Sequence, residues 1–198
     1  IFTDEPKVAP KKPLTYANKQ QDVFLPWTTI LPDDFQKKTG YSILDKLPEL
    51  IWDLPEEKIS RVRYNFHNWI ADRFASVYCG QIGSWCEAHN IMSTGHLYGE
   101  PTLLSQTNAV GDAMRCYPSF GLPGIDMLCD SHEYNTVKQA QSIVRQNGKE
   151  GMLSELYGVT GWDFDFRGHK LQGDWQAALG VTVRVPHLTW MTMKGESK

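Results

Sequence analysis

Acidic and imidazole side chains recur at the ends of the short apolar segments that this sequence predicts to be strands. They are Asp4 and Glu5 after the opening apolar run, His96 and Glu100 around the end of the second segment, Asp126 in the third, Glu155 in the fourth and His187 at the end of the fifth. Carboxylates that lie close together shift each other's pKa values apart, so that one holds a proton while its neighbour stays ionised. This division of roles is what the cleavage of a glycosidic bond requires.

Each of these residues, taken alone, also has an ordinary structural explanation. Asp126 suits the bracing of a turn, and His96 and His187 suit hydrogen-bonded positions in a pocket or core better than they suit metal ligation. Acids with perturbed pKa values also serve structure. The coincidence of such residues across successive segments is therefore what favours a functional site.

Helices and short strands alternate along the chain after residue 60. Apolar residues three and four positions apart predict a long helix over Arg61–Ala88. Further helices are predicted over Leu103–Tyr117, Thr136–Gln146 and Asp174–Leu179, and strands over Ile91–Leu97, Gly124–Leu128, Met152–Leu156 and Val181–His187. Alternation at this spacing argues for parallel strands with crossover helices. In a parallel barrel the carboxyl ends of the strands converge on one mouth, where functional residues gather.

The region at about 7–60 interrupts this alternation. It is rich in proline, lysine and aspartate, yet too aromatic for a flexible linker. We predict short helices within it near Asp33–Lys38 and Leu44–Leu50. The whole chain, 1–198, is therefore interpreted as a single domain with a long inserted loop region.

The composition is that of an ordinary globular protein and excludes some partners. Hydrophobic residues make up 41% of the 198 residues and charged residues 22%, with a net charge of −3. Neither nucleic acid nor an anionic membrane is an expected partner. The four cysteines, Cys79, Cys86, Cys116 and Cys129, form no CxxC pair, so buried thiols are expected rather than a zinc site.

Several short motifs occur in a fixed order along the chain. They include Phe2-Thr3-Asp4-Glu5-Pro6, Leu25-Pro26-Trp27-Thr28, Thr94-Gly95-His96 with Glu100, Pro123-Gly124-Ile125-Asp126, Ser154-Glu155, Tyr157-Gly158, Gly161-Trp162 and Val185-Pro186-His187. As an ordered set they resemble the barrel domain of large, mostly bacterial glycoside hydrolases. The set is similar to the α-L-rhamnosidase-like group and to the large clan A of barrel glycosidases.

This resemblance implies an α/β fold, namely a partial (β/α)₈ TIM barrel that holds strands four to eight. Glu5, after strand four, would be the acid/base, and Glu155, on strand seven, the nucleophile. Asp4 stands where the clan often has asparagine. The implied sugar-binding residues are Asp4, Trp27, His96, Glu100, Asp126, Tyr157, Trp162 and His187.

The resemblance also implies the partners and the setting of such an enzyme. The substrate would be a plant or other complex polysaccharide, and the remaining N-terminal part of the same barrel would complete the fold. A secreted or periplasmic location is consistent with this substrate. No cofactor is expected, although the rhamnosidase-like enzymes leave room for a calcium ion.

Three other functions remain open at this point. The first is an inverting, calcium-assisted rhamnosidase-like hydrolase in which Glu100 or Glu155 is the general base. The second is a metal-dependent barrel isomerase or hydrolase, with ligands drawn from His96, Glu100, Asp126, Glu155 and His187. The third is a barrel that binds carbohydrate without catalysis.

Overall fold

Five strands form one parallel sheet in a computed structural model that describes residues 1–8, 11–12, 14, 16–128 and 132–187. The strands are β1 (Phe2–Thr3), β2 (Thr94–Gly95), β3 (Leu122–Met127), β4 (Leu153–Leu156) and β5 (Val183–Pro186). Their spatial order follows the sequence, β1-β2-β3-β4-β5. Of the strand predicted over Ile91–Leu97, only Thr94–Gly95 is observed as a strand. The strands predicted after it start within two residues of the observed ones.

The sheet confirms the expected fold class in its coarser form. Every described strand pair is parallel, and each strand pairs with the next one along the chain. This is an α/β fold consistent with part of a larger barrel, since sequential parallel strands are the arrangement of a (β/α)₈ barrel. β1 and β5 form the two edges of the described sheet.

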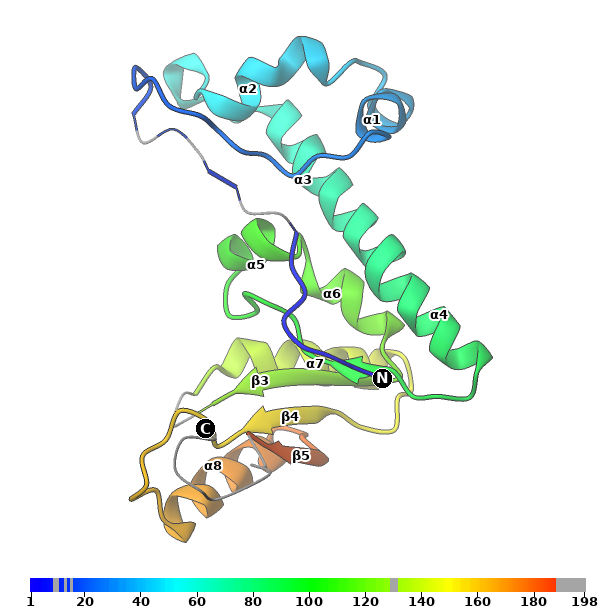
Figure 1. Cartoon of the computed structure of the whole chain (residues 1–198), viewed down its shortest axis with the longest axis vertical. Helices are drawn as coiled ribbons and strands as arrows, with labels where there is room; N and C mark the ends of the chain where they lie inside the picture. Colours follow the sequence, from blue (N-terminus) through cyan, green and yellow to red (C-terminus); the bar gives the residue numbers. More distant parts are fainter. Residues whose placement is uncertain (9–10, 13, 15, 129–131, 188–198) are drawn as a thin grey trace, which may run out of the picture.

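Helices α7 (Tyr134–Gln146) and α8 (Phe166–Ala178) make the crossovers on either side of β4, and α7 packs on β3 (Figure 1). The predicted helix over Thr136–Gln146 is confirmed. The predicted helix over Asp174–Leu179 was too short, because the helix starts at Phe166, where the Asp165 side chain accepts the N–H of Gly168. Phe166 and Leu171 point to solvent, so the first turns lack an apolar stripe.

The single helix predicted over Leu103–Tyr117 is wrong, because the segment is broken into three pieces. These are α5 (Leu103–Ala109), α6 (Ala113–Cys116) and the 3₁₀ turn η4 (Tyr117–Ser119). Gly111 adopts φ 86° at the break, and a Cβ there would lie 2.5 Å from the Cα of Ala71. The close approach of the long helix thus requires both glycine and a left-handed backbone at this point.

The long helix predicted over Arg61–Ala88 is present, with a change of geometry inside it. α3 (Arg61–Phe74) continues through a π-helical turn, η3 (Ala75–Gly80), into α4 (Gln81–Ala88). Its start is fixed by Ser60, whose hydroxyl accepts the N–H of Arg63. α3 and α4 run as one oblique rod from the upper helices down to the sheet (Figure 1).

The inserted region forms a helical lobe at the end of the molecule away from the strands (Figure 1). Its elements are α1 (Leu31–Thr39), η1 (Leu44–Lys46), α2 (Leu47–Ile51) and η2 (Pro55–Glu57). α1 has Pro32 in its first turn, acidic Asp33 and Asp34 near its start, and Gly40 at φ 83° as its C-cap. The two short helices predicted in this region are therefore confirmed.

The two parts of the molecule have separate hydrophobic cores. The lower core lies between the sheet and its helices and includes Ile125, Met127, Val137, Tyr117 and Met152. The upper core joins α1 to α3 through Leu31, Phe35, Phe66, Trp69 and Ile70. The expected buried thiols are confirmed for Cys79, Cys86 and Cys116, whereas Cys129 lies outside the described residues.

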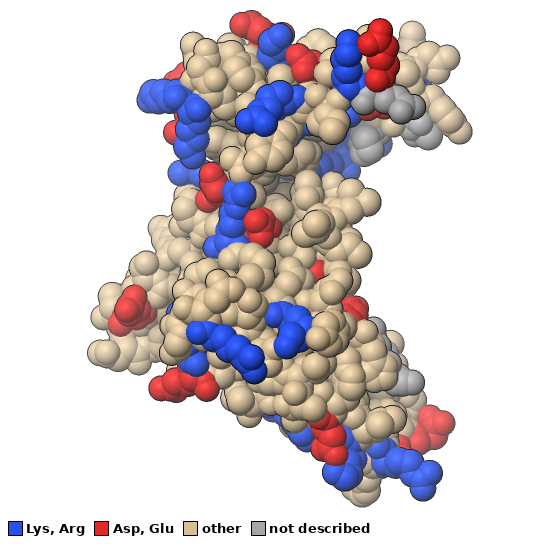
Figure 2. All heavy atoms as spheres, turned by 180° about the vertical axis from the view of Figure 1, so that it is seen from behind, with Lys and Arg blue, Asp and Glu red and all other residues tan. Residues whose placement is uncertain are grey.

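The surface carries no broad field of one charge on the face seen from behind. Lysine and arginine are interspersed there with aspartate and glutamate (Figure 2). Of the helices in the described part of the chain, none has both the length and the apolar character needed to cross a bilayer.

Candidate active site at the carboxyl ends of the strands

The parallel register brings the predicted acidic and imidazole residues to one edge of the sheet. Asp126 on β3 lies directly beside Glu155 on β4. Asp4 and Glu5 leave β1, His96 leaves β2 and His187 leaves β5, each just past the carboxyl end of its strand. We call the set of Asp4, Glu5, His96, Asp126, Glu155 and His187 the acidic rim.

His96 is the centre of the acidic rim. Its side chain is fully buried, and its Nε2 lies 2.8 Å from Oε2 of Glu155 and 3.6 Å from Oδ1 of Asp4. The ring packs edge-on against Phe2, with 5.5 Å between the ring centroids. Its Nδ1 has no hydrogen-bond partner among the described residues. The imidazole thus holds the Glu155 carboxyl group in place from inside the sheet.

Glu155 has a second imidazole on its other oxygen. Nε2 of His187 lies 3.9 Å from Oε1 of Glu155, whose side chain is only 11% exposed. Gly158 permits this arrangement, because a Cβ at that position would lie 2.7 Å from Cγ of His187. Two imidazoles, one following β2 and one following β5, therefore frame one nearly buried carboxylate.

Asp126 has a perturbed acidity at this edge of the sheet. Burial raises the pKa of Asp126 to about 6, and the charges of Glu155 and Glu5 also raise it, against the opposing effects of His96 and His187. Its Oδ1 is buried without a hydrogen-bond partner among the described residues. Asp126 therefore holds a proton in mildly acidic solution beside Glu155.

A hollow of about 270 Å³ opens next to the acidic rim. Glu5, Glu100, Asp126 and Glu133 contribute carboxylates to its wall. Glu5 adopts φ 43°, a left-handed conformation that is uncommon for residues other than glycine. The hollow falls just below the ~300–1,000 Å³ range of ordinary ligand pockets.

Glu100 lies deeper than the rest of this set. Its carboxyl group accepts the N–H of Leu97 at 3.1 Å and makes a short hydrogen bond with the hydroxyl of Tyr117. Complete burial raises the pKa of Glu100 to about 8, although these two hydrogen bonds lower it in part. Burial also raises the pKa of Tyr117 well above its usual value. Glu100 is therefore a neutral, internally bonded group at neutral pH.

The three predicted aromatic residues lie in the helical lobe and in the loop after β4, outside the set that forms the acidic rim. Trp27 lies four residues before α1, in the helical lobe, and is 45% exposed. Tyr157 and Trp162 belong to the loop after β4. The Tyr157 ring packs against those of His169 and Phe164, with centroids 4.6 Å and 6.4 Å away, while Trp162 is 77% exposed.

Sequence reasoning missed two residues of this site. Glu133 lines the hollow from the start of α7, where its Oε2 accepts a hydrogen bond from Thr136 at 2.9 Å. Its position after β3 and before a helix was an available signal, because loops at this end of parallel strands supply functional side chains. Tyr117 had no such signal, since it reaches Glu100 from a 3₁₀ turn that sequence patterns did not predict.

The rim also contains a set of donors that could hold a metal ion. Ligand atoms of Asp4, His96 and Glu155 all lie within 4.8 Å of one another. Calcium prefers six to eight oxygen ligands, whereas an imidazole beside carboxylates suits transition metals better. The set therefore fits a calcium ion poorly and a divalent transition ion better.

Comparison with known proteins gives a match in structure. No family model matches the sequence, and no curated protein matches it. Among solved structures, the chain is similar to a rhamnosidase from Novosphingobium sp. PP1Y, with a TM-score of 0.65 and 20% sequence identity over 81% of this chain. The match spans 16% of the rhamnosidase chain. The chain therefore shares the fold of one segment of a much longer glycosidase.

Proposed function

We propose that this chain forms the catalytic part of a glycoside hydrolase, with Glu155 and Glu5 as its pair of catalytic carboxylates. The observation that supports this most is the coupling of a nearly buried Glu155 to His96 at 2.8 Å, next to an Asp126 whose pKa is raised to about 6. Glycoside cleavage needs two neighbouring carboxyl groups, of which one is protonated and the other ionised, and the rim of this parallel sheet brings such groups together. The structural likeness to a rhamnosidase segment points to the same class.

In this proposal Glu155 is the ionised partner. The hydrogen bond from His96 and the nearby imidazole of His187 fix the orientation of the Glu155 carboxylate within the rim. It attacks the anomeric carbon or orients the water that does so. His96 and His187 act as positioning residues, because they reach the substrate through Glu155.

Glu5 supplies the proton to the leaving oxygen. It lines the hollow together with Asp126, so its carboxyl group reaches a sugar held there. Asp126 holds a proton in mildly acidic solution, which leaves the negative charge of this pair on Glu155. Asp4, Glu100 and Glu133 bind or brace around the sugar, and the carboxyl separation decides between retention at ~5–5.5 Å and inversion at ~6.5–9.5 Å.

The sheet needs further strands for this activity. The outer edges of β1 and β5 are open in the described sheet, and eight strands are needed to close a barrel of this kind. We propose that the N-terminal part of the same barrel supplies them and deepens the hollow beside the rim. Trp27 and Trp162, exposed on the lobe and on the loop after β4, are proposed as outer sugar contacts.

The test is turnover of aryl glycosides by the protein with the complete barrel, with an aryl α-L-rhamnoside in the panel. Glu155→Gln and Glu5→Gln should each lower kcat by ~10²–10⁴, while Glu150→Gln, at an exposed position away from the rim, should leave it unchanged. Added azide should restore turnover of a Glu155→Ala variant if Glu155 is a nucleophile. Near-normal kcat in both rim variants would contradict the assignment, and sugar binding without turnover in the unaltered protein with the complete barrel would indicate a non-catalytic barrel.

A metal-dependent enzyme is the second candidate, supported by the donor set of Asp4, His96 and Glu155. Under this hypothesis the metal would polarise a substrate oxygen or lower the pKa of a bound water, and these three residues would hold it. Chelator treatment followed by elemental analysis distinguishes the two candidates. Loss of turnover with the chelator, and recovery with a divalent transition ion, would favour the metal enzyme over the two-carboxylate hydrolase.

A further inference from the structure

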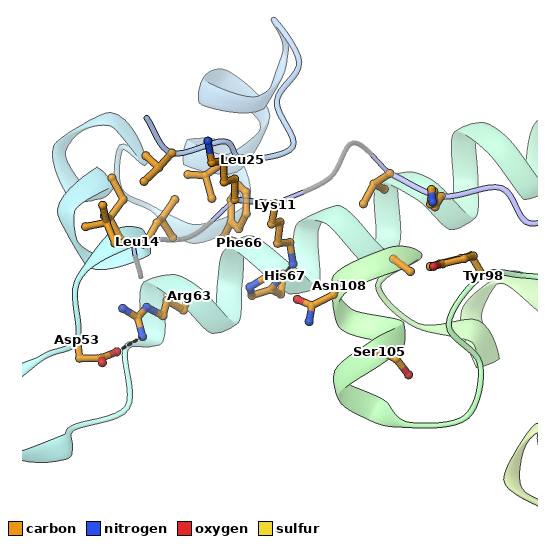
Figure 3. Close-up of a pocket in the computed structure, with 17 residues that line it drawn as sticks. Lys11, Leu14, Leu25, Asp53, Arg63, Phe66, His67, Tyr98, Ser105 and Asn108 are labelled. Carbon is orange, nitrogen blue, oxygen red and sulfur yellow. Dashed lines mark hydrogen bonds and ion pairs between the residues drawn. The ribbon is translucent and has the colours of Figure 1, made fainter. Parts of the chain in front are cut away.

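A second, larger cavity lies away from the acidic rim. It has a volume of about 770 Å³ and is lined by the extended segment before α1 together with α2, α3 and α5 (Figure 3). This size falls within the ~300–1,000 Å³ typical of ligand pockets. Nothing in the proposed hydrolysis uses it.

The charge of this cavity is opposite to that of the protein as a whole. Lys7, Lys11, Lys12 and Arg63 line it with one carboxylate, that of Asp53. The whole chain nevertheless has a net charge of −3. Nη1 of Arg63 is paired with Oδ1 of Asp53 at 2.6 Å (Figure 3). The three lysines therefore give the cavity its excess of positive charge.

None of these three lysines has an acidic partner within the described part of the chain. Nζ of Lys7 lies over the ring of Tyr98, 4.1 Å from its centroid, and Nζ of Lys12 lies 5.5 Å from the centroid of Phe24. Aromatic faces attract cations but carry no net charge. The positive charge at the cavity is thus held in place without being neutralised.

Lys11 is the most enclosed of these cations. Its Nζ donates to the carbonyl oxygen of Thr107 at 2.9 Å and lies 2.8 Å from Nδ1 of His67. Burial lowers the pKa of Lys11 to about 8. Burial, together with the charges of Lys11 and Arg63, lowers the pKa of His67 to about 4, so His67 is neutral and accepts the hydrogen bond. Among the described residues, no acceptor is seen for the third N–H of the ammonium group, which can therefore donate to a ligand.

The cavity wall is apolar on one side of Lys11. Leu14, Leu25 and Phe66 gather there, whereas Asn108, Ser105 and Tyr98 lie on the other side (Figure 3). A simple inorganic anion would leave these apolar side chains without contact. A ligand that combines one negative group with an apolar body would satisfy both parts of the wall.

We propose that this cavity binds a small carboxylate with an apolar body, its carboxylate paired with Lys11 and its body packed against Phe66 and Leu25. The carboxylate supplies the counter-charge that the partly buried ammonium lacks among the described residues. This binding goes beyond the proposed hydrolysis and does not depend on it, because no residue of the acidic rim lines the cavity.

The first test is calorimetric titration of the protein with naphthalene-2-carboxylate and with the matched neutral naphthalene-2-carboxamide. The carboxylate should bind at least about tenfold more tightly than the amide, since one charge-assisted hydrogen bond is worth that much or more. Lys11→Met should remove this preference, and Lys37→Met, on the exposed end of α1, should keep it. Equal binding of the two probes, or an unaltered preference in Lys11→Met, would overturn the proposal.

A second measurement uses the unaltered protein and so avoids any folding defect of the variant. An amine with a lowered pKa reacts readily with an acylating reagent near pH 8, and mass spectrometry can follow the modification of Lys11. The carboxylate should protect Lys11 at least about tenfold, and the amide should not. Absence of protection overturns the proposal, and equal protection by inorganic phosphate would reject the apolar body as part of the ligand.

Discussion

The acidic rim and the cavity lined by Lys7, Lys11 and Lys12, which we call the cationic cavity, differ in the partners that they offer to ionisable groups. At the rim, carboxylates meet imidazoles within a few ångströms, as when Nε2 of His96 contacts Glu155 at 2.8 Å. In the cavity, Lys11 meets a neutral imidazole and a backbone carbonyl. Burial raises the pKa of Asp126 to about 6 and lowers that of Lys11 to about 8. Burial therefore favours the neutral form at both sites, but only the rim supplies its own counter-charges.

The difference follows from how each site is built. Rim residues come from neighbouring strands whose register places Asp126 beside Glu155. Cavity cations such as Lys11 come from an extended segment that crosses the helices (Figure 3). A sheet can hold partners of opposite charge at fixed spacing, whereas the irregular segment leaves its ammonium groups to be neutralised by something else.

The largest effect that would sharpen this comparison is expected at Glu100. Its folded-state pKa of about 8 lies above the ordinary 4.5, so its contribution to stability is fully present below about pH 4.5 and is lost as the pH rises through 8. The free energy of unfolding should fall by up to ~1.4 kcal/mol per pH unit in this window. Glu100→Gln should flatten this slope in urea titrations across pH, with Glu150→Gln as control. An unchanged slope in Glu100→Gln would show that Glu100 is ionised in the folded protein.

A smaller loss of stability is expected when the rim loses the imidazole of His96. His96→Leu should lower the free energy of unfolding at pH 7 by ~1–3 kcal/mol, because the Glu155 carboxyl group is left nearly buried without its donor. His96→Gln, whose amide can still donate, should recover part of this loss. Urea denaturation measures both. Equal stability of the leucine variant would mean that Glu155 does not depend on His96.

The rim also predicts a pH dependence of the proposed activity. Asp126 gains its proton below about pH 6, so the rate on an aryl glycoside should change with a midpoint near that value. Asp126→Asn should remove this limb of the pH profile and lower kcat about tenfold near pH 6. Asp163→Asn, in the loop after β4, is the matched control. A limb that persists in Asp126→Asn would assign the titration to another rim residue.

The smallest effect on the free energy of unfolding is expected for Lys11 in the cavity. Its dependence on pH has the opposite sign to that of Glu100. Because the folded-state pKa of Lys11 is about 8 and its ordinary value 10.5, its contribution is present above 10.5 and lost as the pH falls through 8. The free energy of unfolding should therefore rise slightly between these values, weakly because the amine is only partly buried. Lys11→Met should abolish this rise, and Lys37→Met should not. A rise that survives in Lys11→Met would place the buried charge elsewhere.

Sequence patterns predicted the elements whose residues repeat with a clear period. The α3–α4 rod and the strands β3 and β4 fall near their expected ranges, because α3 buries a face at helical spacing and the two strands bury most of their residues. The first turns of α8 escaped prediction, since Phe166 and Leu171 are exposed. The break at Gly111 depends on the approach of Ala71, a contact that no local pattern encodes.

The candidate site was predictable where the sheet alone determines position. Glu155, Asp126 and His96 converge because parallel neighbours have fixed register. Trp27 was grouped with them by motif order, but the route of the chain through the helical lobe decides where it lies. The cationic cavity was not anticipated, because the lysines between residues 7 and 12 follow no helical or strand period.

The π-helical turn at Ala75–Gly80 changes which side chains of the α3–α4 rod lie on its buried side. Phe74 and Cys79 are both buried although they are five positions apart, an offset of about 140° on a regular α-helix of 3.6 residues per turn. The wider turn absorbs one additional residue and brings both side chains back to the same side. Removing one residue from this turn would rotate everything after it by roughly 100°, so that Cys86 would swing out of the interior. One additional amino acid thus sets which side of the lower half of the rod faces the sheet domain.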